Sequence, residues 1–335
     1  MHEQFAFAEA MSYYPCSKER RQKKDSPLTP AEHKGFRSIV GGLLWLCRTR
    51  SDHCAELGAL QKNQSKPTVA DLIGANTLLR KVKDTAHLHY LRYKTQPAGP
   101  KRLIVDADSS FNARTDPKSR SRAGWTVALV PDDAESLDCS CAHVRSAISR
   151  NVNRVTKSTL SAEGVAHCAG LEEAIRVAGW YAELLGPIGR TMHQITLTES
   201  GGALIPIDAC TDARSLYDVI TSAVDPSPAD TGAILWFRWI REVYQKSLVR
   251  RAIWKGTDDM LADVLTKSGV DSSRLRSAMA DGEYWTQYAC VCGGGVIDAY
   301  KGMPPSKKDR DGKPQEAEAW FAQILLAIVA RSDDA

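Results

Sequence analysis

Four acidic residues follow one another along the chain in four distinct local contexts. Asp106 ends the apolar run Leu-Ile-Val, and Asp212 follows the run Ile-Asp-Ala-Cys-Thr, so both acids are expected at the ends of β-strands. Glu163, in Ser-Thr-Leu-Ser-Ala-Glu, and Asp263, in Leu-Ala-Asp-Val-Leu-Thr-Lys, open helical patterns. This order constrains the chain to a sheet with helices packed on it, and it can gather four carboxylates at one edge of that sheet.

Four carboxylates so close together repel one another unless cations bind between them, and oxygen ligands select hard divalent ions. Two such ions, about 4 Å apart, suit an in-line displacement at phosphorus. The pattern therefore predicts a metal-dependent nuclease. Asp108 competes with Asp106, because it lies two residues further along on the same strand face. The position at the end of the apolar run favours Asp106.

Apolar periodicity predicts the remaining elements. Helices are expected over 36–47, 52–61 and 68–83, ahead of the turn-rich stretch Gln96-Pro-Ala-Gly-Pro100. Strands are expected over 103–107, 124–130, 142–148, 204–209 and 248–254, and helices over 161–185, 213–222, 232–246 and 259–267. The second half is thus an α/β unit with a mixed five-stranded sheet flanked by helices, preceded by a small helical lobe.

These elements divide the chain into six parts. We expect a flexible basic arm at 1–35, the helical lobe at 36–98, the α/β domain at 99–268, a C-terminal extension at 269–300, a linker at 301–315 and a terminal helix at 316–335. The linker stretch Lys-Gly-Met-Pro-Pro-Ser-Lys-Lys-Asp-Arg-Asp-Gly-Lys-Pro has the composition of disordered segments.

Charge is distributed unevenly between the two halves. Residues 1–102 contain 18 lysines and arginines against 9 acids, whereas the remainder contains 26 against 31. A basic lobe beside an acidic domain fits a grip on a polyanion next to a metal-loaded carboxylate site, although a solvated basic surface gives the same count. The densest basic runs are 18–24 and Arg80, Lys81 and Lys83.

The nine cysteines form no C-x-x-C pair, so a zinc ribbon is not expected. Their odd number and scattered spacing indicate a reducing, cytoplasmic location. The N-terminal residues lack the basic start and apolar core of a signal peptide, and the late apolar stretch 320–330 is too short to span a bilayer. We therefore expect no membrane association.

The chain resembles the C-terminal part of a copia-type retrotransposon Pol polyprotein, through roughly residues 28–288. The similar stretches are Phe36-Arg-Ser-Ile-Val-Gly-Gly-Leu-Leu-Trp-Leu, Arg50-Ser-Asp and Ser65-Lys-Pro-Thr68, followed by Asp106-Ala-Asp108, Ser161-Ala-Glu163, Thr211-Asp-Ala-Arg-Ser215 and Leu261-Ala-Asp-Val-Leu-Thr-Lys267. That part comprises the end of the reverse transcriptase and the ribonuclease H domain.

The resemblance implies a ribonuclease H-like fold and cleavage of the RNA strand of RNA–DNA hybrids. It implies that Asp106, Glu163, Asp212 and Asp263 hold two Mg²⁺ (or Mn²⁺) ions, with the rest of a Pol polyprotein as a further partner. Discrimination of RNA would come from contacts to the 2′-hydroxyl groups. The candidate nucleic-acid-binding residues are Ser110, Asn112, Asn153 and Arg154 near the site, with Arg80, Lys81 and Lys83 on the lobe.

Two departures from the family pattern leave alternatives open. Family members commonly carry a histidine where this chain reads Asp230-Thr-Gly-Ala233, and Gly164 stands where a tyrosine is common. A retroelement remnant that binds nucleic acid without cutting it is one alternative, and a transposase-type nuclease is another. Asp258-Asp259 lacks the preceding aromatic residue of a polymerase hairpin and is expected to cap the last helix, so no polymerase activity is expected.

Overall fold

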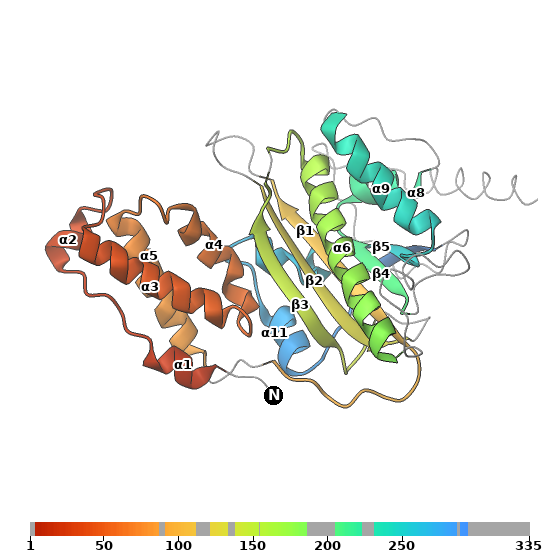
Figure 1. The fold of residues 1–335 in the computed structure, drawn as a ribbon, viewed down its shortest axis with the longest axis horizontal. Helices are drawn as coiled ribbons and strands as arrows, with labels where there is room; N and C mark the ends of the chain where they lie inside the picture. The colour runs from red at the N-terminus through yellow and green to blue at the C-terminus, as the bar shows by residue number, and fades with distance from the viewer. Residues whose placement is uncertain are drawn as a thin grey trace, which may run out of the picture.

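The computed structural model describes residues 4–86, 91–111, 121–132, 138–153, 155–185, 205–222, 231–286 and 289–293. Two parts are evident in Figure 1: a lobe of helices from the first third of the chain, and a twisted sheet with helices on both faces. The expected linker at 301–315 and terminal helix at 316–335 lie outside the described residues. Among those residues, no helix is long and apolar enough to cross a membrane.

The lobe is built from five helices: α1 (Phe5–Ala10), α2 (Lys18–Gln22), α3 (Pro30–Leu46), α4 (Cys54–Lys62) and α5 (Val69–Asp84). Capping boxes begin both long helices, because Thr29 pairs with Glu32 at α3 and Thr68 with Asp71 at α5. The apolar faces of α3, α4 and α5 form one buried core with Phe36, Leu57 and Leu79. This confirms the helices expected over 36–83.

Residues 4–35 differ from the flexible arm that the sequence suggested. The backbone of Tyr14 exchanges hydrogen bonds with the Asn76 side chain, at 3.0 and 2.9 Å. The Arg20 guanidinium binds both carboxylate oxygens of Glu32, and Pro27 forms a β-bridge with Thr68. Local sequence patterns give no signal for these contacts, because the contacts join residues far apart in the sequence.

The sheet has the strand order β3-β2-β1-β4-β5-β6. Its strands are β1 (Lys101–Ser110), β2 (Arg122–Pro131), β3 (His143–Asn151), β4 (Ile207–Thr211), β5 (Arg251–Lys255) and β6 (Ala289–Gly293). The first three are antiparallel neighbours, β4 and β5 run parallel to β1, and β6 is antiparallel to β5. The five expected strands are therefore present, and the C-terminal extension adds a sixth.

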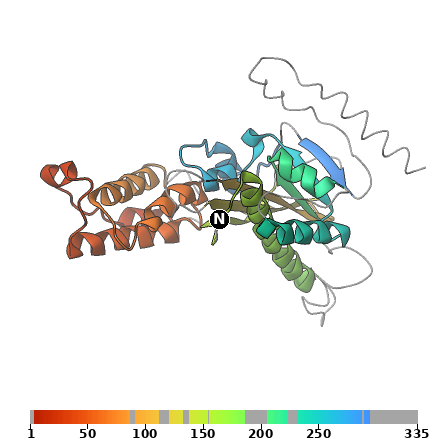
Figure 2. The same cartoon turned by 90° about the horizontal axis from the view of Figure 1, so that it is seen from above.

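Different helices cover the two faces of the sheet (Figure 2). On one face, α6 (Thr159–Leu185), α8 (Arg214–Thr221) and α9 (Ile234–Gln245) pack on Val105 and Ala107 of β1. On the other face, α10 (Asp263–Thr266) and α11 (Ser273–Ala280) pack near Ile104. Successive strand residues alternate between faces, so Asp106 and Asp108 belong to the α10 side with Ile104.

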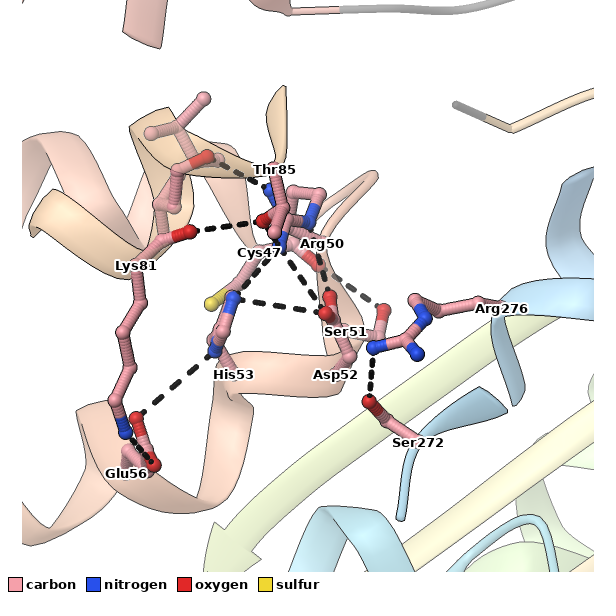
Figure 3. A network of polar contacts seen from close by, with 12 residues as sticks. Cys47, Arg50, Ser51, Asp52, His53, Glu56, Lys81, Thr85, Ser272 and Arg276 are labelled. Carbon is pink, nitrogen blue, oxygen red and sulfur yellow. Dashed lines mark hydrogen bonds and ion pairs between the residues drawn. The ribbon is translucent and has the colours of Figure 1, made fainter. Parts of the chain in front are cut away.

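The lobe and the sheet meet along α4 and the 3₁₀ helix η1 (Ser51–His53), both of which contact α10. The buried Arg50 side chain stabilises the lobe's side of this junction (Figure 3). The Arg50 guanidinium donates to both carboxylate oxygens of Asp52 at 3.1 Å, to the Val82 carbonyl at 3.1 Å and to Thr85 Oγ1 at 2.9 Å. The Arg50-Ser-Asp segment therefore ties the end of α5 to the element that supports α10.

Candidate metal centre

Three carboxylates come together where β1, β4 and α6 meet. They belong to Asp108 near the end of β1, Glu163 near the start of α6 and Asp212 directly after β4. One oxygen from each lies within 4.8 Å of the others. Asp108 and Glu163 are buried and Asp212 is half-buried, so the cluster opens to solvent on the Asp212 side.

Burial and mutual repulsion perturb two of these acids. Burial raises the pKa of Glu163 to about 9, and the neighbouring charges of Asp108 and Asp212 act in the same direction. Burial also raises the pKa of Asp108 to about 7, against the opposing charge of Lys267. A bound cation would favour the ionised form of both groups, so the cluster is suited to binding a positive ion.

The donor set fits a hard divalent ion. Glu163 Oε1 accepts a hydrogen bond of 2.8 Å from Ser109 Oγ, which orients the carboxylate. Glu163 Oε2 is buried and has no hydrogen-bond partner among the described residues, and the residue as a whole is 5% exposed. A buried carboxylate oxygen left without a partner is costly, and carboxylate oxygens are the ligands that Mg²⁺ and Mn²⁺ prefer.

Asp263 lies beside this cluster and is held by another group. It is the first residue of α10, and its carboxylate forms an ion pair with Lys267 one turn later. The Lys267 ammonium is also 3.6 Å from Asp108 Oδ1, and Thr266 Oγ1 donates to Asp108 Oδ2. Asp263 is thus adjacent to the three-acid group without belonging to it.

Asp106, which the sequence favoured over Asp108, lies outside the cluster. Its Oδ1 is 2.6 Å from Lys255 Nζ, and the Tyr284 hydroxyl lies 3.3 and 3.4 Å from its two oxygens. Asp106, Lys255 and Tyr284 are all buried. The internal lysine already neutralises Asp106, so the structure places Asp108 where the sequence suggested Asp106.

The other expected site residues lie partly near the acids, partly on the lobe and partly outside the described residues. Ser110 ends β1 two residues after Asp108 and is half-buried, and Asn153 is exposed just after β3. Asn112 and Arg154 lie outside the described residues. On α5, Arg80 is exposed, Lys81 pairs with Glu56 at 2.7 Å, and Lys83 donates to the Glu9 carbonyl at 2.9 Å.

Asp258 and Asp259 do not cap the last helix. They lie in the 3₁₀ helix η4 (Thr257–Asp259), and α10 begins only at Asp263 with Ala262 at its N-cap. Asp259 is buried and forms an ion pair with Arg274 of α11. Asp258 is therefore an exposed acid, whereas Asp259 has a structural role in a buried ion pair.

Three residues near the acids were missed by the sequence prediction: Ser109, Thr266 and Lys267. Each contacts a carboxylate of the site through a hydrogen bond or an ion pair. The available signal was the motif Leu-Ala-Asp-Val-Leu-Thr-Lys, because residues four apart on a helix are neighbours. That spacing places Lys267 against Asp263.

The strand order and directions of β1 to β5, with helices on both faces, identify the architecture. The fold is ribonuclease H-like. No protein-family model and no curated protein matches the chain.

Solved structures similar to the chain include ribonuclease H domains. One is the N-terminal RNase H domain of a Mycobacterium tuberculosis protein, at 15% identity and a TM-score of 0.29, covering 49% of this chain and 90% of that chain. A second is LC11-RNase H1, isolated from compost by a metagenomic approach, at 14% identity and 0.31, covering 49% and 91%. The third is the Prototype Foamy Virus protease-reverse transcriptase, at 15% and 0.30, covering 64% of this chain and 29% of that one. Because these TM-scores are below 0.5, the fold assignment depends on the topology above.

Proposed function

We propose that this chain is a metal-dependent endonuclease of the ribonuclease H type, which hydrolyses the RNA strand of RNA–DNA hybrids. The observation that supports it is the convergence of Asp108, Glu163 and Asp212, together with the partnerless buried Glu163 Oε2. The resemblance to copia-type Pol polyproteins supplies the hybrid substrate and the context of a retrotransposon protein, and both belong to the proposal.

The proposed site uses Mg²⁺ or Mn²⁺ held by Asp108, Glu163 and Asp212, with Asp263 at the position of a second ion. When bound, the ions would lower the pKa of a water molecule and stabilise the leaving 3′ oxygen. The protein orients the ligands: Ser109 fixes Glu163, and Thr266 fixes Asp108. Pre-oriented ligands reduce the reorganisation needed on binding.

The chain's own groups would also bind the substrate. Ser110 and Asn153 can donate and accept hydrogen bonds, so they are our candidates for contacts to 2′-hydroxyl groups of the RNA strand. The basic lobe would contact phosphates without regard to sequence. No polymerase activity is proposed, because Asp259 is engaged by Arg274.

The test is cleavage of an end-labelled RNA–DNA hybrid by the full chain with Mg²⁺, compared with duplex DNA and duplex RNA. We expect the protein to cut the RNA strand of the hybrid and to leave duplex DNA and duplex RNA intact. EDTA should abolish this cleavage. Asp218→Asn is a matched control, because Asp218 is a solvent-facing acid paired with Arg214 on α8. Tight hybrid binding without cleavage, under all metal conditions, would refute the proposal and favour a non-catalytic remnant.

A further inference from the structure

Lys267 places a positive charge beside the acidic cluster, between Asp108 and Asp263. It follows the last residue of α10, and its ammonium pairs with Asp263 while lying 3.6 Å from Asp108 Oδ1. Its charge also acts on Asp212 and on Glu163. No other lysine among the described residues forms an ion pair with one of the acids of this site.

The ammonium lies between Asp108 and Asp263, the two acids that a second ion would have to share. An ion bound between Asp108 and Asp263 would use the same carboxylate oxygens that face Lys267 Nζ. The two cations would therefore compete for these oxygens, because both near Asp108 and Asp263 repel each other. The three-acid group of Asp108, Glu163 and Asp212 remains open to a first ion.

A comparison with the second lysine on this face shows why Lys267 can leave. Lys255 is fully buried, 2.6 Å from Asp106 and 3.0 Å from the Tyr284 hydroxyl, so its charge is fixed inside the protein. The Lys267 side chain is 39% exposed. Its flexible four-carbon stem can therefore carry the ammonium into water.

We propose that Lys267 is a tethered cation in the second metal position, so that the resting site takes one divalent ion and admits a second only when this side chain moves away. The inference builds on the proposed function, since it assigns the order in which that site is loaded. Lys267 is a positioning residue here: it acts on the occupancy of the site through Asp108 and Asp263.

The experiment counts Mn²⁺ ions bound to the metal-stripped full chain by electron paramagnetic resonance, without nucleic acid. We expect the wild type to bind one ion tightly, and a second at least tenfold more weakly. Lys267→Met should bind both ions with affinities within tenfold of each other, because the competing charge is gone. Lys267→Arg keeps the charge and should retain the one-ion pattern.

Two further variants control the assignment. Lys246→Met removes an exposed lysine paired with Glu242 and should leave the count unchanged. Asp263→Asn, combined with Lys267→Met, should remove the second ion again. Circular dichroism checks folding in each case, and Lys267→Gln, which also removes the charge, tests the proposal if the methionine variant does not fold.

The outcomes separate the two proposals. Two tight ions in the wild type, or an unchanged count in Lys267→Met, would overturn the role of Lys267 and leave the nuclease proposal standing. A wild type that binds no Mn²⁺ at millimolar concentration would refute both.

Discussion

Two aspartates on one face of one strand have different environments. Asp106 faces Lys255 and Tyr284 inside the protein, whereas Asp108 faces Glu163, Asp212 and Lys267 at the strand end. The first is neutralised by a buried ion pair and the second belongs to an acid cluster. Neighbours on β5 and α10, distant in sequence, therefore determine which aspartate is neutralised and which joins the acid cluster.

This difference predicts opposite outcomes for two conservative substitutions. Asp108→Asn should reduce hybrid cleavage at least about a hundredfold, because it removes one unit of metal-binding charge. Its melting temperature in EDTA should stay level or rise, since repulsion within the cluster falls. Asp106→Asn should destabilise the fold by about 3–5 kcal/mol, because it leaves the Lys255 charge buried without a counterion.

Denaturant unfolding and single-turnover cleavage measure the two effects separately. Asp106→Asn protein that remains folded should retain a Mn²⁺ affinity close to that of the wild type. If Asp106→Asn were stable and inactive while Asp108→Asn cut normally, the sequence-based choice of Asp106 would be right and our reassignment wrong.

The raised pKa values of Asp108 and Glu163 predict the pH dependence of stability without metal. The folded state holds these protons more tightly than the unfolded state, so the contribution to stability is complete below about pH 4 and is lost as the pH rises through about 7 for Asp108 and about 9 for Glu163. In EDTA, the melting temperature should therefore fall between pH 5 and pH 9.

Added Mg²⁺ binds the ionised carboxylates, so its stabilising effect should grow over the same pH range. The double variant Asp108→Asn with Glu163→Gln removes both titrations and should show a flatter profile in EDTA and no response to Mg²⁺. Calorimetric scans at five pH values test this. Parallel profiles for wild type and double variant would exclude these two acids as the source.

At the scale of elements, sequence periodicity predicted α3, α4 and α5 of the lobe and all five strands from β1 to β5, but not α1 and α2. The prediction for β1 was too short, since the strand was expected over 103–107 and is observed over Lys101–Ser110. Polar residues beyond Ala107 interrupt the apolar run on which the prediction depended. That error in length put Asp106 next to the expected strand end and left Asp108 outside the expected strand. The ion pair of Asp106 with Lys255 joins residues on different strands, so local pattern contains no signal for it.

The C-terminal extension was harder to predict for the same reason. Its α11 packs on the α10 side of the sheet, β6 adds an edge strand beside β5, and Tyr284 from this segment reaches Asp106. These short elements are ordered through tertiary contacts, which override weak local propensity. Of the acids that the local motifs indicated, Glu163 and Asp212 lie in the three-acid cluster, near a helix start and at a strand end.

Close packing of β2 against α10 makes Gly124 a test of how the site is supported. Gly124 pairs with Asp108 across the β1–β2 ladder, and an added Cβ would lie 2.7 Å from Leu265 Cβ and 2.8 Å from Thr266 Cγ2. Gly124→Ala should therefore displace α10 and destabilise the fold by about 1–3 kcal/mol. We also expect weaker Mn²⁺ binding, because Thr266 and Lys267 move with the helix.

Gly41→Ala is the matched control on α3, where an added Cβ meets no atom within 4 Å. Helix propensity alone should stabilise that variant by up to about 1 kcal/mol. Urea unfolding and Mn²⁺ titration of both variants give the comparison. Wild-type metal affinity in Gly124→Ala would show that the site tolerates movement of α10.

At the scale of the whole molecule, the lobe supports the site as well as carrying charge. Its α4 and η1 contact α10, and Gly58 of α4 leaves room for the buried Arg122 guanidinium of β2. The Arg122 guanidinium donates to Ser149 Oγ at 3.0 Å and to Asn151 Oδ1 at 3.2 Å. Deleting residues 1–98 would therefore expose part of α10, and point substitutions are the better test of the lobe's charge.

The last prediction concerns the three cations near the end of α5. Arg50 ties this end of α5 to η1, beside the α/β domain, and Lys81 lies next to Glu56 of α4 in the same region (Figure 3). Each phosphate neutralised contributes a slope of about −0.9 in log affinity against log salt. Arg80→Gln should flatten the slope for hybrid binding by up to about 0.9.

Lys81→Gln should flatten it less, because Glu56 already neutralises part of that charge at 2.7 Å. The triple glutamine variant should lose about one to two units of slope, with most of the affinity change at low salt and little change in cleavage at saturating hybrid. Fluorescence anisotropy between 50 and 300 mM salt measures this, with Lys246→Gln as the control. Equal slopes for wild type and the triple variant would mean that these cations form a solvated surface, and that the acidic domain holds the hybrid through other contacts.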